Sequence, residues 1–205
     1  MGLDKLDRKP GLVPGAGRWL LPVLVLLVAI LLGLGGEMAQ QWLRFDRAAI
    51  SSGELWRLVT GHFVHLGWSH FALNGAGLVL VWYLVGDVFD WIQWFLIGVF
   101  TVITMDIGLW LFDPGLMWYV GLSGLLHGIL AAGLMDKLRK PDKEALILML
   151  LLLGKLAWEQ FSGPLPGSES KAGGTVVVAS HLFGALGGVV AAILLRIRVR
   201  HAASI

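Results

Sequence analysis

A serine stands among glycines inside an apolar segment of this chain, in the run Gly121-Leu-Ser-Gly-Leu-Leu-His-Gly128. Alone it would carry little information, because serine and glycine commonly pack helices against one another in membranes. Two other apolar segments contain polar residues of complementary chemistry, His70 with Asn74, and His181. A hydroxyl, imidazoles and an amide in three such segments indicate acyl-transfer chemistry.

Each of these residue types has a role in nucleophilic catalysis. A histidine within hydrogen-bond reach of Ser123 can take the hydroxyl proton as general base, and His181 is the candidate. His70 and Asn74 are four residues apart, hence on one helix face, and both can donate hydrogen bonds to an oxyanion. The backbone N–H of Ser123, near the start of its helix, is a third donor. No carboxylate partner for His181 is apparent, so a Ser–His dyad is the simplest catalytic unit.

The composition indicates that these residues are positioned by transmembrane helices. The 205 residues are 57% hydrophobic and 15% charged, and the mean hydropathy is +0.76, values typical of integral membrane proteins. No cysteine is present, which excludes a thiol nucleophile and a disulfide framework. Six apolar stretches predict membrane-spanning helices over residues 19–35, 69–86, 91–112, 119–135, 145–160 and 176–196.

The distribution of Lys and Arg predicts the orientation of these helices. Eleven of the sixteen lie before the first stretch, between the fourth and fifth, or at and beyond the end of the last. By the positive-inside rule both termini are then cytoplasmic, as an even number of spans requires. The small excess of basic over acidic residues therefore reflects membrane topology and not nucleic-acid binding. We expect the first span to be a retained helix and not a signal peptide, because no clear small-x-small cleavage site follows it.

One membrane domain is expected over residues 19–197, between cytoplasmic segments 1–18 and 198–205. The outer side carries residues 37–68, expected to lie at the membrane interface, and a turn-rich loop over 163–174. Nothing in the pattern indicates a repeat or a second domain.

In this topology, the second, fourth and sixth spans run in the same direction, so their polar residues share one depth. Ser123, His181, His70 and Asn74 each lie within roughly 10 Å of the outer helix end. Small-residue ridges predict that the fourth and sixth helices touch; they comprise Gly124, Gly128 and Ala132, and Ser180, Gly184, Gly188 and Ala192. Each polar residue alone fits helix packing, but four at one depth favour a catalytic site.

At these residues the chain resembles the rhomboid intramembrane serine proteases. The shared motifs are Trp56-Arg57, Gly61-His62, His70-x-x-x-Asn74, Gly121-x-Ser123-Gly124 and His181-x-x-Gly184-x-x-x-Gly188. The resemblance implies an all-α, six-helix membrane bundle that hydrolyses peptide bonds in or beside transmembrane segments. It also implies that Ser123 is the nucleophile, His181 the base, and His70 and Asn74 the oxyanion donors. The fifth helix and its loops, residues 145–174, would gate substrate entry.

His127 extends the motif to Gly-x-Ser-Gly-x-x-His-Gly, which resembles the rhombosortase subgroup. That resemblance implies a bacterial inner-membrane enzyme whose active site opens to the periplasm. Its substrates would carry a C-terminal tail of glycine-rich motif, transmembrane helix and basic cluster. His127 could alternatively be the base or a packing residue. His181 is preferred as base because His127 lies one turn deeper on the helix of Ser123.

The remaining polar residues suggest no cofactor or metal. His62, His65 and His70 lack a His-Glu-x-x-His pattern, and loop hydrogen bonding explains the first two better. Asp106 is expected to satisfy neighbouring donors and, lying far from Asp87, to share no proton with it. Lys155 and Glu159 are four apart and form an ion pair, snorkel to the interface, or contact the substrate tail.

Two other classes of function are open. A catalytically silent rhomboid-like protein could bind or escort membrane clients, although intact nucleophile, base and donor positions count against it. A transporter fits less well, because the polar residues gather in the outer half of the membrane and form no path across it. The oligomeric state does not follow from the sequence.

Overall fold

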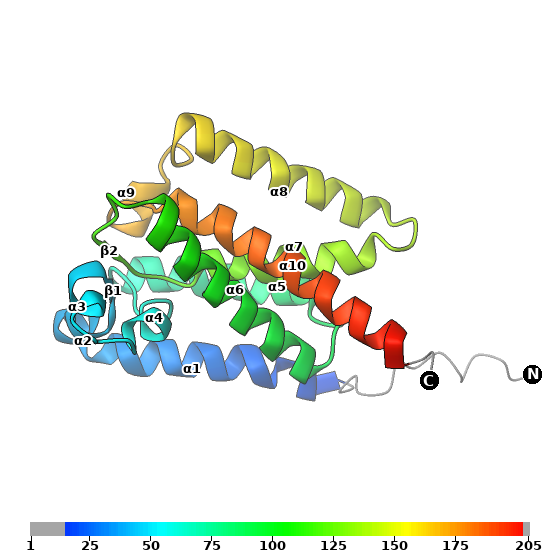
Figure 1. The fold of residues 1–205 in the computed structure, drawn as a ribbon, viewed down its shortest axis with the longest axis horizontal. Helices are drawn as coiled ribbons and strands as arrows, with labels where there is room; N and C mark the ends of the chain where they lie inside the picture. The colour runs from blue at the N-terminus through cyan, green and yellow to red at the C-terminus, as the bar shows by residue number, and fades with distance from the viewer. Residues whose placement is uncertain (1–14, 203–205) are drawn as a thin grey trace, which may run out of the picture.

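The computed structural model describes residues 15–202, with side chains described as far as residue 195. Residues 1–14 and 203–205, which belong to the expected terminal segments, lie outside the described part. Six long helices run roughly along one direction of the bundle (Figure 1). They are α1 (Leu20–Leu34), α5 (Trp68–Val85), α6 (Trp91–Phe112), α7 (Ser123–Lys137), α8 (Lys143–Ser162) and α10 (Val178–Ala202).

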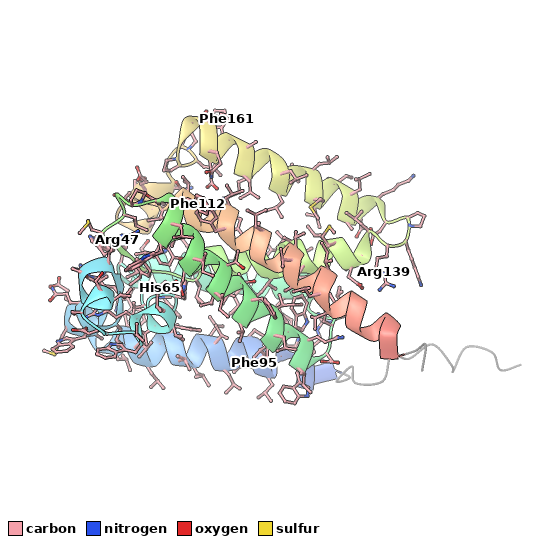
Figure 2. The ribbon with its side chains drawn as sticks, in the orientation of Figure 1. Arg47, His65, Phe95, Phe112, Arg139 and Phe161 are labelled. Atoms are coloured by element: carbon pink, nitrogen blue, oxygen red, sulfur yellow. The ribbon has the colours of Figure 1, made fainter. Side chains whose placement is uncertain are left out.

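Each of the six predicted stretches overlaps one of these helices. Among the described residues, five are long and apolar enough to cross a membrane: α5, α6, α8, α10, and α1 with the preceding turn Gly15–Trp19. Helix α7 has only 15 residues and is shorter than the roughly 20 that span a hydrocarbon core. Large apolar side chains cover the outside of the bundle, and Figure 2 shows Phe95 and Phe161 pointing away from it. The chain is thus a multi-pass, helical membrane protein.

The fourth helix starts at Ser123, so the prediction of a helix from residue 119 was wrong. Trp118–Tyr119 form the short strand β2, which pairs antiparallel with β1 (Phe45–Asp46). Gly121 then takes a φ of +120°, which an L side chain rarely adopts. This turn breaks the apolar stretch and leaves Ser123 as the first residue of α7.

The segment before α5 is a folded cap that contains α2 (Gly36–Leu43), β1, α3 (Arg47–Ser51) and α4 (Arg57–Thr60). Two arginines hold it together through backbone carbonyls. Arg57 is buried and donates to the carbonyls of Gln41 and Arg44. The Arg47 guanidinium donates to four carbonyls at and just beyond the end of α6, which a helix end leaves without partners inside the helix.

The segment predicted as a turn-rich loop between α8 and α10 also contains a short helix, α9 (Ser168–Ala172). Positive φ angles at Gly167 and Gly173 turn the chain into and out of it. The Ser69 hydroxyl at the start of α5 donates to the carbonyl of Lys171. This contact holds α9 against the end of the bundle at which α5, α7 and α10 begin.

Helices α7 and α10 form the tightest contact of the fold. A Cβ built on Gly184 would lie 2.1 Å from the carbonyl oxygen of Gly124, and one on Gly188 would lie 2.0 Å from that of Gly128. Only glycine permits such an approach, so the two backbones touch along their small-residue ridges. Nine of the fifteen residues of α7 are buried. We call this contact the α7–α10 seam.

Helix α8 packs more lightly, and Figure 1 shows it at the upper edge of the bundle. Of its twenty residues, four are buried: Ala145, Leu152, Leu156 and Glu159. They lie along one stripe of the helix, and the remaining faces present leucines to the surroundings. A glutamate at the end of an otherwise apolar buried stripe needs a polar partner.

Candidate active site

Ser123 stands at the start of α7 in a loop held by backbone hydrogen bonds. The N–H of Gly121 donates to the carbonyl of Gly61 at 3.0 Å, and the Tyr119 hydroxyl donates to the carbonyl of Gly121. As the first residue of α7, Ser123 has a backbone N–H without an acceptor inside the helix. The hydroxyl and a free backbone donor therefore lie side by side.

His181 of α10 meets this hydroxyl across the α7–α10 seam. Its Nε2 lies 2.9 Å from the Ser123 Oγ, and the His181 ring is buried. The seam sets this distance, because Gly124 follows Ser123 directly and Gly184 lies one turn after His181. The two side chains are thus within reach for transfer of the serine proton.

Glu159 of α8 lies on the other side of the His181 ring. Its Oε2 is 2.9 Å from His181 Nδ1, and its Oε1 is 2.7 Å from the Nζ of Lys155. The expectation that no carboxylate would partner His181 is therefore wrong. Of the alternatives for Lys155 and Glu159, the ion pair is present. A glutamate inside an apolar helix was the available signal, but the sequence did not show which way it faces.

His127 packs against His181 and bonds to the backbone of Ser123. Its ring stacks on that of His181 with centroids 4.2 Å apart and planes 17° from parallel. Its Nδ1 donates to the carbonyl oxygen of Ser123 at 2.7 Å. Of the roles left open for His127, this geometry favours packing, since its Nδ1 is already bonded to the backbone.

His70 and Asn74 of α5 face the loop that precedes Ser123. The backbone N–H of Leu66 donates to His70 Nδ1, so neutral His70 carries its proton on Nε2. A Cβ built on Gly121 would lie 2.9 Å from His70 Nε2 and 3.6 Å from Asn74 Nδ2. Asn74 Nδ2 is buried and has no hydrogen-bond partner among the described residues. Two donors are thus available next to the hydroxyl.

A cavity of about 260 Å³ connects these groups. Its polar lining includes Ser123, His181, His70, Asn74, Lys155 and Glu159, together with Tyr119, His127, Ser168 and Thr175. Apolar residues of the α8–α10 connection, Leu165, Ala172 and Val176, cover another side. The space is enclosed by the four helices α5, α7, α8 and α10 and by the segment around α9.

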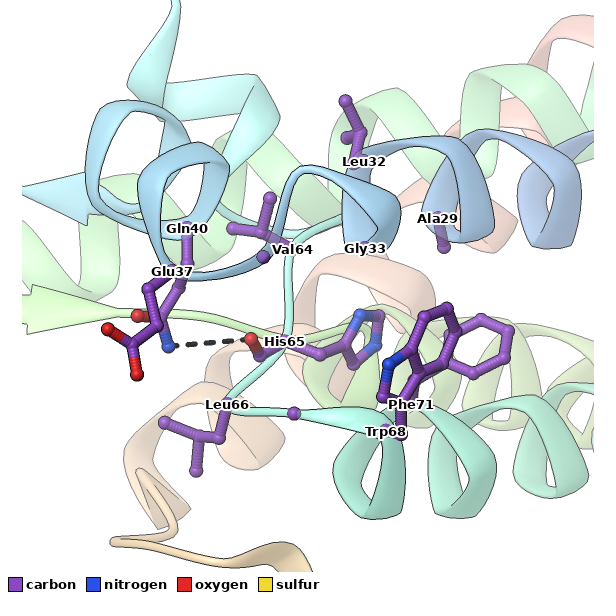
Figure 3. Close-up of a pocket in the computed structure, with 12 residues that line it drawn as sticks. Ala29, Leu32, Gly33, Glu37, Gln40, Val64, His65, Leu66, Trp68 and Phe71 are labelled. Atoms are coloured by element: carbon purple, nitrogen blue, oxygen red, sulfur yellow. Dashed lines mark hydrogen bonds between the residues drawn. The ribbon is translucent and has the colours of Figure 1, made fainter.

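A second cavity of similar size, about 270 Å³, lies between α1, α2 and the start of α5 (Figure 3). Glu37, Gln40 and His65 contribute its polar atoms, and Gln40 donates to the carbonyl of His65. Burial, and secondarily the neighbouring His70, lowers the pKa of His65 to about 4, so its ring is neutral at pH 7. No serine, threonine or cysteine lines this cavity, which makes the cavity at Ser123 the candidate active site.

His62 and Asp106 form a separate buried pair. His62 Nε2 lies 3.1 Å from Asp106 Oδ1, so Asp106 satisfies a neighbouring donor, as expected. This pair lies outside the lining of the cavity at Ser123.

The donor set of His127, Glu159 and His181 raises the question of a metal ion, because one ligand atom from each falls within 4.8 Å of the others. Stacked imidazoles hold their in-plane lone pairs parallel, so these do not converge on one ion. Both His181 nitrogens and His127 Nδ1 already have partners. The residues fit a hydrogen-bonded relay better than a coordination sphere.

A helical membrane bundle that presents a serine, a histidine and facing donors at one end defines a class of intramembrane hydrolase. The family model of the Rhomboid domain matches residues 52–198. The chain belongs to the rhomboid family, whose members are intramembrane serine proteases. No curated protein matches the sequence. Helix α1 precedes the matched region.

Proposed function

We propose that this protein is an intramembrane serine endopeptidase in which Ser123 is the nucleophile and His181 the general base. The observation that carries the proposal is the 2.9 Å contact between Ser123 Oγ and His181 Nε2, beside donors without acceptors. A helix-packing role would not require a buried amide donor to remain unpaired. The intact pair also disfavours a catalytically silent escort protein.

In the proposed acylation step, His181 Nε2 takes the hydroxyl proton while Ser123 Oγ attacks the scissile carbonyl carbon. The negative charge on the carbonyl oxygen is stabilised by the N–H of Ser123, the Nε2–H of His70 and the Nδ2–H of Asn74. The tetrahedral intermediate then breaks its C–N bond, and the His181 imidazolium gives its proton to the leaving amine. An acyl ester remains on Ser123.

In the deacylation step, a water molecule or another amine attacks the ester carbonyl. His181 takes the proton of this nucleophile, and the same donors stabilise the second oxyanion. The Ser123 oxygen leaves and recovers the proton from His181. The step uses only groups that line the cavity.

For the substrate, we propose a membrane-anchored protein with a C-terminal tail of glycine-rich motif, transmembrane helix and basic cluster. The motif Gly-x-Ser-Gly-x-x-His-Gly, which resembles the rhombosortases, supports this choice. A small cavity with apolar walls also suits a chain of small residues better than bulky ones. The proposed location is the bacterial inner membrane, with the site open to the periplasm.

The distribution of charge along the bundle supports this orientation. Helix α1 begins and α10 ends at the same end of the bundle, opposite the cap of α2, α3 and α4 (Figure 1). Basic residues gather where α7 joins α8 at that end, with Lys137 as the last residue of α7 and Arg139 in the loop that follows. By the positive-inside rule this end faces the cytoplasm and Ser123 faces outward.

The test is cleavage of a tailed, single-span substrate reconstituted with the purified protein in liposomes. We expect wild-type protein to cut beside the transmembrane segment, with product termini mapped by mass spectrometry, and Ser123→Ala and His181→Ala to be inactive. His70→Ala and Asn74→Ala should each lower kcat by about 100- to 1000-fold. Binding of the tail without cleavage would support the escort function instead. Normal cleavage by Ser123→Ala would reject the mechanism.

A further inference from the structure

We infer that Glu159 is a positioning residue for His181, so that α8 completes a hydrogen-bonded Ser123–His181–Glu159 relay. In this relay the charge of Lys155 offsets that of Glu159 and so adjusts the basicity of His181. The inference rests on the proposed function, because it concerns the base of the same reaction. It goes beyond the Ser–His pair by assigning a third member and a counter-charge. Both added residues lie on the lightly packed helix.

Glu159 selects the tautomer of His181 that the reaction needs. An ionised carboxylate only accepts hydrogen bonds, so the 2.9 Å contact with Glu159 Oε2 requires the proton on His181 Nδ1. Nε2 then carries the lone pair and can accept the Ser123 hydroxyl proton. In the opposite tautomer, Nε2 would donate to Ser123 and could not act as its base.

Lys155 works against this selection. Its Nζ lies 3.3 Å from His181 Nδ1, where it would donate if Nδ1 carried no proton. In the structure the ammonium is instead held 2.7 Å from Glu159 Oε1. With Glu159 removed, Lys155 would favour the tautomer that leaves Ser123 without a base. Glu159 therefore both orients His181 and sequesters the competing donor.

The charges of the two residues act on the imidazolium that forms during catalysis. Glu159 is 3% exposed, so little solvent screens its attraction for the positive ring. A carboxylate in this position stabilises the imidazolium without taking its proton. Lys155 offsets part of that attraction, because its ammonium lies close to the same ring nitrogen. Removing either residue should change the basicity of His181, and in opposite directions.

Few other ionisable groups face His181 within the described part of the chain. His127 of α7 stacks on its ring, and His70 of α5 and Tyr119 of β2 line the same cavity. On α6, Asp106 pairs with His62 instead. The two α8 residues are thus the nearest charged groups, and the pH dependence of catalysis reports on them.

The experiment measures kcat, KM and the pH–rate profile for three variants with the reconstituted tailed substrate. For Glu159→Gln, which keeps the side-chain shape, we expect kcat to fall at least about 100-fold with KM within a few-fold. The acidic limb of its kcat profile should move to lower pH. For Lys155→Met, which keeps the stem, that limb should move to higher pH. Ser123→Ala should be inactive.

A spectroscopic measurement tests the tautomer without turnover. In wild-type protein we expect a low-field proton resonance from the hydrogen-bonded Nδ1–H of His181, and we expect its loss in Glu159→Gln. Thermal unfolding in detergent establishes which variants are folded. If Glu159→Gln does not fold, the opposite shift predicted for Lys155→Met still tests the inference.

The outcomes separate this inference from the proposed function. Wild-type kcat and an unshifted pH profile in folded Glu159→Gln would overturn the inference, provided that Ser123→Ala is inactive. If Lys155→Met moved the acidic limb to lower pH, the assigned counter-charge role would be wrong. If Ser123→Ala retained activity, the proposed function itself would fail.

Discussion

The α7–α10 seam and the contact of α8 hold their catalytic groups in different ways. At the seam, glycine backbones touch, and a Cβ at Gly184 or Gly188 would meet a carbonyl oxygen at 2.1 or 2.0 Å. Helix α8 instead contributes four buried residues, and a Cβ at its Gly154 would meet nothing within 4 Å. Ser123 and its proposed base His181 are therefore fixed by backbone contact, and the carboxylate of Glu159 by side chains.

The difference suggests how one site can hold its reacting groups in a precise geometry and still admit a substrate. Catalytic geometry must be held closely, because small displacements of reacting groups cost large factors in rate. The seam meets this need for Ser123 and His181. A helix with few buried side chains can move at lower cost, so α8 could admit a substrate while the seam stays closed.

Adding one methyl to the seam should be far more damaging than adding one to α8. In Gly184→Ala the new Cβ overlaps the Gly124 carbonyl oxygen, and such overpacking costs about 1–3 kcal/mol, with more expected where backbone must move. Gly154→Ala is the matched control, because open space surrounds it. Unfolding in detergent measures both. Equal free energies of unfolding for the two variants would show that the α7–α10 seam has room for a side chain.

A methyl at Gly121 should damage catalysis more than one at Gly163, although both glycines have positive φ. The backbone strain is shared, but only at Gly121 would the Cβ meet the His70 ring, 2.7 Å from Cε1. Displacing this proposed oxyanion donor should lower kcat by about 100-fold or more. Gly163→Ala, after α8, should remain within a few-fold of wild type. A mild effect at Gly121 would argue against His70 as a donor.

Truncating a buried leucine should affect mainly the free energy of unfolding on α7, but also kcat on α8. Leu134→Ala on α7 should destabilise by about 2–5 kcal/mol without changing kcat of the folded protein. Leu156→Ala on α8 should destabilise less, because acyl chains can fill the space, but should lower kcat by about tenfold through displacement of Glu159. Unchanged kcat in Leu156→Ala would indicate that Glu159 is held independently of α8 packing.

Replacing His127 should have the smallest effect if its ring only packs. His127→Phe keeps a ring over His181 and loses the bond to the Ser123 carbonyl, so kcat should fall by only a few-fold. His127→Ala removes the stack and should be slower than His127→Phe. If both variants were equally inactive, an imidazole function of His127 beyond packing would be required.

Much of the bundle follows from the sequence because length and hydropathy define apolar helices. The six predicted stretches each overlap a helix, since an α-helix satisfies its backbone hydrogen bonds within one segment, as lipid requires. The prediction failed at the start of the fourth helix, because hydropathy does not detect the positive φ of Gly121. It also missed α9, a five-residue helix set between two glycines.

The relay was harder to predict than the pair at its centre. Small-residue ridges on the helices of Ser123 and His181 indicate which faces approach. Helix α8 has no such ridge, and lipid and protein interior are both apolar, so hydropathy does not show its rotation about its axis. Glu159 therefore fitted an ion pair with Lys155 as well as it fitted any other role. Its contact with His181 required the three-dimensional structure.

The most direct test of the account is covalent labelling by a fluorophosphonate, which reacts with a serine activated by a neighbouring base. We predict one adduct on folded wild-type protein, located on Ser123 by peptide mass spectrometry. We predict no adduct on Ser123→Ala or His181→Ala. An adduct at another residue, or no labelling of folded protein that still cleaves substrate, would contradict the assignment of Ser123 and His181.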